Sequence, residues 1–205
     1  MSRVPHRKWQ DLLGAWAVAP TLADAMFEDV VRQYADLGRF YHTLDHIEAV
    51  LEAVESLGSF AQNLNAVKLA AWLHDAIYDS RASDNEERSA DYAEQWCRKL
   101  SIPEGRLVAV LILKTKTHDA SDDADAQVLI DADLAILGAS EPAYQAYAAN
   151  IRREYAWVPE AEYRMGRRQV LERFLTKPRI FCLSGELEEP ARRNLAAEIT
   201  RLESR

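Results

Sequence analysis

The chain is poor in the features that mark secreted and membrane proteins. Among its 205 residues there are two cysteines, Cys97 and Cys182, which lie far apart and form no C-x-x-C pair. A disulfide framework is therefore not expected, and a reducing cytoplasm is the expected location. No charged segment, apolar run and small-residue cleavage site opens the chain, and no run reaches the roughly 18 apolar residues of a membrane span. We expect a soluble, cytoplasmic protein with no membrane partner.

Positive charge is also scarce. The formal net charge is −8 and the isoelectric point is near 5.2. Proteins that hold long nucleic acids gain affinity by releasing counterions to a basic surface, so this charge balance argues against long DNA or RNA as a partner. A small phosphorylated ligand is compatible with it, because a local basic pocket can lie within an acidic surface. A homodimer is left open as the oligomeric state.

Glycine and proline, which interrupt helices, occur only seven times each. Apolar residues recur at spacings of three and four rather than two, which predicts an all-α protein. Short connections and the absence of a repeat or linker predict a single domain over residues 1–205, built as a bundle of about ten helices. The predicted N-caps are Thr21, Thr43 and Ser83. The predicted helices span 7–17, 22–37, 43–57, 64–79, 84–100, 103–117, 123–138, 141–156, 160–176 and 188–203.

Two histidines stand four residues apart where a helix is predicted to begin. In YHTLDHIEAV (41–50), His46 precedes Val50 by four residues, which places it on or beside the apolar face. His42 lies one turn earlier, at the start of the helix. The pair therefore raises the question of which other ionisable residues share this part of the core.

A second histidine lies on an apolar face further along the chain. In LNAVKLAAWLHDAIY (64–78), His74 continues the apolar stripe of the predicted helix, and Asp75 follows it directly. The alanines around them leave room for polar side chains. We therefore expect His74 and Asp75 to point inward together.

The predicted helix over 123–138 carries an aspartate among apolar residues. The apolar stripe of DADAQVLIDADLAILG is centred on Asp133, whereas Asp131 points more to the opposite side. A buried carboxylate without a partner would cost several kcal/mol, a large part of the roughly 5 to 15 kcal/mol that stabilises a domain. Asp133 is therefore expected to face a cation.

Imidazole and carboxylate groups together are suitable ligands for a divalent transition metal. Taken singly, each signal has an ordinary explanation, since a core histidine can be satisfied locally and a helical aspartate can interact with the helix dipole. Because the residues lie on three helices of one short chain, we predict a metal site formed by His46, His74, Asp75 and Asp133. The ion is left open among Mn, Mg, Fe, Ni, Co and Zn.

The same residues resemble a known signature. His46, then His74-Asp75 in LAAWLHDAIYD, then Asp133 in DADLAILG are similar to the H…HD…D pattern of the HD superfamily of metal-dependent phosphohydrolases. The family's A-D-L pattern also selects Asp133, and Asp131 is kept as an outer partner of the metal site. The resemblance covers nearly the full chain, including REYAWVPEAEY and ARRNLAAEI, and is nearest to an uncharacterised bacterial clade of this superfamily.

The resemblance implies an HD-type helical bundle, a bound divalent metal ion and a small phosphorylated substrate. YHTLDHIEAV is similar to the Y-H-x-x-x-H segment of mammalian-type cyclic nucleotide phosphodiesterases, which implies that His42 is the proton donor and His46 a ligand. Water activated by the metal would attack phosphorus, and Asp75 would orient it or bridge a second ion. The segment AIYDS lacks the Glu-Asp pair of guanosine tetraphosphate hydrolases, so that activity is not expected.

Further residues are candidates for binding phosphate. Lys114 and His118, at the end of one predicted helix, could flank a phosphate, although a histidine there also suits the negative end of a helix. Arg153 is the third candidate, alternatively part of a solvated face. Glu86 is a candidate outer acid or second-metal ligand, but a capping box with Ser83 explains it better. Other arginines considered for a phosphate clamp are Arg152, Arg164, Arg167 and Arg168.

The leading hypothesis is thus a phosphomonoesterase or phosphodiesterase acting on a small nucleotide or another phosphorylated metabolite. One alternative is a regulatory module that binds a nucleotide without turnover, which the complete H…HD…D set disfavours. Another is a di-iron oxygenase on the same scaffold, which would need more histidines; His118 is the only extra one at hand.

Overall fold

A computed structural model describes residues 3–204, and over this range the protein is all-helical, as the sequence predicts. The described chain contains ten α-helices and three short 3₁₀ helices, and no strand. It divides into two compact units, one up to Ala132 and the other from Asp133 onward. A single domain over the whole length stays a prediction.

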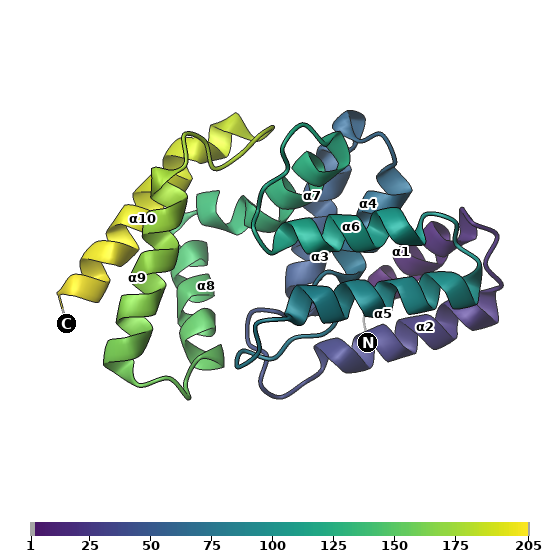
Figure 1. The fold of residues 1–205 in the computed structure, drawn as a ribbon, viewed down its shortest axis with the longest axis horizontal. Coiled ribbons are helices and arrows are strands. Elements are labelled where there is room, and N and C mark those ends of the chain that lie inside the picture. The colour runs from purple at the N-terminus through teal and green to yellow at the C-terminus, as the bar shows by residue number, and fades with distance from the viewer. Residues whose placement is uncertain (1–2, 205) are drawn as a thin grey trace. The chain divides into compact units, whose positions relative to one another are not determined.

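The first unit is organised around α4. This helix packs against α1, α3, α5 and α6, and seven of its ten residues are buried. Figure 1 shows α5 and α6 side by side, in agreement with their extensive contacts. The helices of this unit are α1 (Arg3–Gly14), α2 (Pro20–Tyr34), α3 (Leu44–Ser56), η1 (Gly58–Phe60), α4 (Leu64–Leu73), α5 (Asn85–Leu100), α6 (Gly105–Thr115) and most of α7 (Ala124–Leu134).

Aromatic side chains fix α1 and α2 on the central helix. The rings of Trp9 and Trp72 meet edge to face with centroids 5.2 Å apart, and the ring of Phe27 lies 6.2 Å from that of Trp72. The indole N–H of Trp9 donates to the carbonyl oxygen of Ala23 at 2.9 Å. Large buried rings contribute much of the apolar area of a core, so this cluster anchors the N-terminal helices.

The predicted helix 64–79 ends early, at Leu73, and this corrects the sequence analysis. The carbonyl groups two and three residues further on accept hydrogen bonds from the Arg39 side chain, at 2.6 and 2.8 Å. The N–H and carbonyl groups of Ile77 bond to the Ser89 hydroxyl, at 3.0 and 3.2 Å. Tertiary hydrogen bonds thus replace the helical ones, and the backbone turns away after α4.

Two of the three predicted N-caps are wrong. Thr43 is the N-cap of α3, as predicted. However, α2 begins after Ala19 rather than Thr21, since its first residue is a proline, which is well suited to that position. The N-cap of α5 is Asp84 rather than Ser83, so the predicted capping box does not form.

The helix α7 is buried almost all round, which corrects its predicted orientation. Asp131 was expected to point away from the core, but it is fully buried, with none of its surface exposed. Asp133 is half-buried. The phase of an apolar stripe distinguishes two faces only where one face meets solvent, and here Ala126, Val128 and Ile130 are buried as well.

The second unit contains three long helices that surround a buried ion pair. Arg167 donates to both carboxylate oxygens of Glu198, at 2.8 and 3.1 Å, and the hydroxyl of Tyr144 donates to the same carboxylate at 2.5 Å. Figure 1 shows α9 and α10 packed along each other. The elements of this unit are η2 (Ala135–Gly138), α8 (Glu141–Glu154), α9 (Glu160–Thr176), η3 (Gly185–Leu187) and α10 (Glu188–Glu203).

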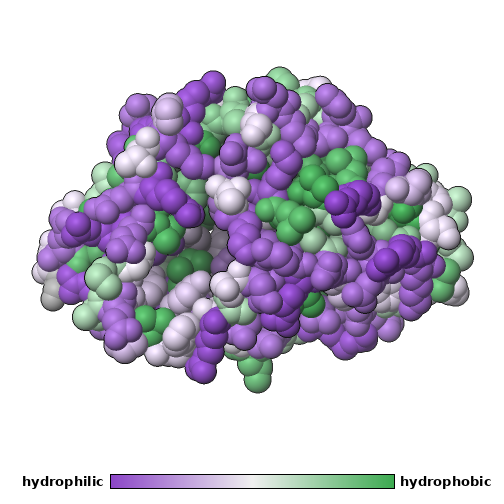
Figure 2. Space-filling view, in the orientation of Figure 1, coloured by the Kyte–Doolittle hydropathy of each residue, from purple (hydrophilic) through white to green (hydrophobic). Residues whose placement is uncertain are grey.

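The face of the protein that Figure 2 shows is mostly hydrophilic, with a patch of apolar side chains on it. Leu113, in α6, is one of the exposed large apolar residues. Within residues 3–204, no helix is both long enough and apolar enough to pass through a bilayer.

Candidate metal centre

Three of the four predicted metal ligands lie together in the first unit. Nε2 of His46 lies 3.4 Å from Nε2 of His74 and 3.6 Å from Oδ2 of Asp75. The third side of this triangle, from His74 Nε2 to Asp75 Oδ2, is 3.1 Å. His46 belongs to the first turn of α3, and the other two residues directly follow α4. The three side chains form a cluster that can hold a metal ion.

The dimensions of the triangle fit an ion. Metal bonds to imidazole nitrogen and carboxylate oxygen are about 2.0 to 2.2 Å long. Two such ligands are then about 3.0 Å apart at a right angle and about 3.4 Å apart at a tetrahedral angle. The observed separations of 3.1, 3.4 and 3.6 Å lie near these values. Little movement would therefore be needed for all three atoms to bind one cation.

A backbone hydrogen bond orients His74 for metal binding. Its Nδ1 lies 2.9 Å from the carbonyl oxygen of Ala71, which can only accept, so Nδ1 carries the proton and donates. In the protonated ring, Nε2 donates to Asp75, whereas in the neutral ring the Nε2 lone pair is directed toward His46 and Asp75 and is available to a cation. This combination, in which one ring nitrogen donates to a carbonyl and the other is available to a metal, is typical of histidine ligands.

The carboxyl of Asp75 is held in its charged form. Burial alone would raise the pKa of Asp75, but the neighbouring charges of His74, His42 and His46 and a hydrogen bond from His74 lower it well below its usual range. His46 and His74 are almost completely buried, whereas the side chain of Asp75 is 18% exposed. The cluster thus offers an ionised oxygen on the side that solvent can reach.

The predicted proton donor lies beside this cluster. His42 is in the irregular segment before α3, and its ring stacks on the ring of Tyr78 at 4.2 Å between centroids. The centroids of the His42 and His46 rings are 6.1 Å apart. His42 is half-buried. Its role as an acid stays a prediction.

The two aspartates of α7 belong to different units. Asp133 is the predicted fourth ligand, but it belongs to the second unit, and its role stays a prediction. Asp131 belongs to the first unit, together with the three clustered residues, and is fully buried. Its assignment as an outer partner of the metal site also stays a prediction.

The predicted phosphate-binding residues have other contacts. Lys114 Nζ lies 3.5 Å from Oδ2 of Asp123. His118 adopts a left-handed backbone conformation with φ of 50°, just beyond the end of α6, and its N–H donates to the carbonyl of Lys114. Its position just beyond the end of α6 agrees with the alternative explanation, in which a histidine suits the negative end of a helix. Arg153, in the second unit, is exposed and donates to Asn150.

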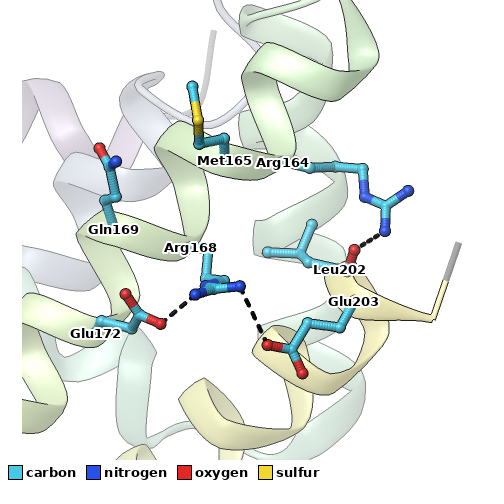
Figure 3. A pocket seen from close by; sticks show the side chains of 7 residues that line it. All are labelled: Arg164, Met165, Arg168, Gln169, Glu172, Leu202 and Glu203. Atoms are coloured by element: carbon cyan, nitrogen blue, oxygen red, sulfur yellow. Dashed lines mark hydrogen bonds and ion pairs between the residues drawn. The ribbon is translucent and has the colours of Figure 1, made fainter.

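The other arginines considered for a phosphate clamp contact neighbouring groups of the second unit. Arg152 donates to the carbonyls of Tyr155 and Val158, in the turn between α8 and α9. Arg164 and Arg168 line a surface groove of about 480 Å³ between α9 and α10 (Figure 3). Arg164 donates to a carbonyl at the end of α10, and Arg168 pairs with two glutamates that also line the groove. These partners leave little reason to expect a phosphate clamp.

Glu86 lies in the first turn of α5 and pairs with a lysine. Its Oε2 is 4.0 Å from Nζ of Lys116, which binds Glu87 more closely, at 2.5 Å. Glu86 is not a member of the cluster of described residues that can hold a metal. A surface ion pair is therefore the contact that the structure provides for it.

Sequence analysis missed two residues around the cluster, Arg39 and Tyr78. Arg39 is buried and contacts both segments that flank the cluster, and Tyr78 stacks on His42. The only sequence signal is their position close to the histidine motifs, at RFYH and HDAIY. Neither residue interrupts a predicted apolar face, which is the signal that identified the histidines and aspartates.

Comparisons with family models, with curated proteins and with solved structures found no match to this chain. The resemblance to the HD superfamily therefore stays a prediction that rests on sequence motifs. The finding that stands independently of it is the buried cluster of two histidines and one aspartate.

Proposed function

We propose that this protein is a metal-dependent phosphohydrolase that acts on a small nucleotide or another phosphorylated metabolite. The observation that carries the proposal is the convergence of His46, His74 and Asp75, whose ligand atoms lie within 4.8 Å of one another. The sequence motifs around these residues supply the reaction class.

Each residue of the site has a definite part in the proposed reaction. A divalent ion held by the cluster would supply a Lewis acid and lower the pKa of water. His74, fixed by the carbonyl of Ala71, presents Nε2 to the ion, and ionised Asp75 adds negative charge at the accessible side. His42, supported by Tyr78, protonates the leaving oxygen, since imidazole can give up a proton near neutral pH.

The proposal is tested by elemental analysis of the protein as isolated, followed by a screen of nucleotides and phosphate esters with Mn²⁺, Co²⁺ or Ni²⁺. We expect a bound transition metal and release of phosphate or nucleoside from at least one compound. Treatment with EDTA should abolish the release, and metal should restore it.

Other outcomes point to other functions. Nucleotide binding in calorimetry without turnover across the panel would indicate a regulatory module instead. Oxygen uptake that depends on iron and an organic substrate would indicate an oxygenase. A protein that binds no divalent ion would contradict the proposal directly.

A further inference from the structure

Arg39 links the two backbone segments that flank the metal cluster. It lies between α2 and α3 and is 7% exposed. Its Nη1 donates to the carbonyl oxygens of Asp75, at 2.6 Å, and of His42, at 3.2 Å, and its Nη2 donates to that of Ala76, at 2.8 Å. One guanidinium group therefore holds the turn after α4 against the segment before α3.

Two aromatic rings support the guanidinium group. The Cζ atom of Arg39 lies 5.0 Å from the ring centroid of Tyr34 and 5.4 Å from that of Tyr78. Tyr34 is itself fixed, because its hydroxyl donates to the carbonyl of Trp72 at 3.0 Å. The ring of Tyr78 in turn stacks on the ring of His42. The cation thus lies between the core and the residue proposed to donate the proton.

A short turn directs Arg39 inward. Asp36 Oδ1 accepts the N–H of Gly38 at 2.8 Å, and the carbonyl of Asp36 accepts the N–H of Arg39 at 3.1 Å. An aspartate side chain that bonds the backbone two residues on is a common way to stabilise a turn. Leu37, at the tip, is 94% exposed, so the turn sends one side chain outward and the cation inward.

We propose that Arg39 is a positioning residue of the metal centre. By binding both segments at once, it fixes His74 and Asp75 relative to His42, so that the ligands and the proton donor keep one geometry. The inference rests on the proposed function. Lysine cannot replace arginine here, because a single ammonium group on a flexible stem does not present the planar set of donors.

The test compares full-length wild-type protein with Arg39→Lys, using Co²⁺ as the probe. Loss of an outer partner of a metal site typically weakens metal binding about 10- to 100-fold, and we expect a loss in this range. The visible absorption bands of bound Co²⁺ should also change, since they depend on ligand geometry. Circular dichroism should show unchanged helical content.

Arg167→Lys is the matched control. Arg167 is similarly buried, at 9% exposed, and its guanidinium group also donates more than one hydrogen bond, but it lies in the second unit. The Arg167→Lys variant should have a lower free energy of unfolding than the wild type, but the same Co²⁺ spectrum and the same Co²⁺ affinity. If both variants change Co²⁺ binding alike, or if Arg39→Lys changes neither spectrum nor affinity, the positioning role is wrong.

Hydrogen exchange separates failure of this inference from failure of the proposed function. In metal-free protein, Arg39→Lys should speed amide exchange in residues 40–43 and 75–78. Wild-type protein that binds no Co²⁺ overturns the metal centre, and faster exchange in the variant then shows a clamp with a purely structural role. If the variant does not fold, Co²⁺ should slow exchange in residues 36–42 of the wild type, and unchanged exchange there would refute the inference.

Discussion

At the scale of single residues, His74 combines two functions in one ring. It donates from Nδ1 to the backbone of its own helix end and presents Nε2 to His46 and Asp75. The ring orientation is therefore set before any ion arrives, which lowers the entropic cost of binding. His42 lies beside the cluster rather than in it, and its ring stacks on the ring of Tyr78.

This difference predicts different effects of two alanine variants. His74→Ala should weaken Co²⁺ or Mn²⁺ binding by about 100-fold or more, since a ligand counts for more than an outer partner. His42→Ala should bind the ion as the wild type does, but lose about 10²- to 10⁴-fold in turnover through the missing proton donor. Equilibrium dialysis and initial rates measure the two effects. Equal loss of metal in both variants would mean that His42 is a ligand.

A half-buried glutamate in the second unit, Glu188, predicts a pH effect on stability. The Glu188 carboxylate accepts the N–H groups of Ile180 and Phe181 and pairs with Arg192. Burial alone would raise the pKa of Glu188, but these donors lower it below its ordinary value of 4.5. The stabilisation is therefore complete above pH 4.5 and is lost as the pH falls through the lower pKa of the folded protein.

Glu188→Gln should accordingly lower the free energy of unfolding by about 1 to 3 kcal/mol at pH 7. As the pH falls through the lowered pKa of the folded protein, the difference from the wild type should shrink, because the wild-type carboxyl then becomes neutral as well. Urea denaturation over a series of pH values from 7 downward measures this. Glu189→Gln, exposed in the same helical turn, is the control and should change stability by less than about 0.5 kcal/mol. A constant difference at all pH values would contradict the assignment.

At the scale of elements, the sequence predicts most helices well because their apolar periodicity and ends are local properties. The bounds of α9 and α10 agree with the prediction to the residue. The end of α4 was not predictable, because it depends on side chains from distant segments, Arg39 and Ser89. The orientation of α7 failed for a related reason, since a helix covered on all sides has no solvent face to reveal its phase.

Two glycines of the second unit predict opposite effects of alanine. A Cβ atom at Gly138 would lie 2.7 Å from Cβ and 2.9 Å from the backbone oxygen of Leu187, so Gly138→Ala should cost about 1 to 3 kcal/mol. A Cβ atom at Gly166, inside α9, would meet nothing within 4 Å. Gly166→Ala should therefore stabilise the protein by about 0.5 to 1 kcal/mol. Urea denaturation gives both values, and destabilisation by both variants would contradict this packing.

At the scale of the whole molecule, the sequence predicts the helical class and three members of the cluster that the structure brings together. His46, His74 and Asp75 were identifiable because ionisable side chains interrupt apolar stripes. The contacts of Lys114 and the backbone conformation of His118 could not be predicted, because apolar periodicity does not determine which groups a surface side chain contacts.

A single cooperative domain predicts that metal binding stabilises the chain as a whole. At a free ion concentration of 100 times the dissociation constant, the expected gain is about 2.7 kcal/mol. Calorimetry with and without Co²⁺ should show one transition that moves to higher temperature. Two transitions, of which only one moves, would show that the units up to Ala132 and from Asp133 unfold separately.

The residues of the cluster and those around it come from different kinds of backbone. His46 belongs to a core helix and His74 directly follows another, whereas His42 and Tyr78 come from irregular segments on either side. Close-packed interiors accept few substitutions, while loops diverge readily. In descendants of this chain, the proposed metal site would be inherited nearly unchanged. Selectivity for a new substrate would arise by changes in the two short loops that carry His42 and Tyr78.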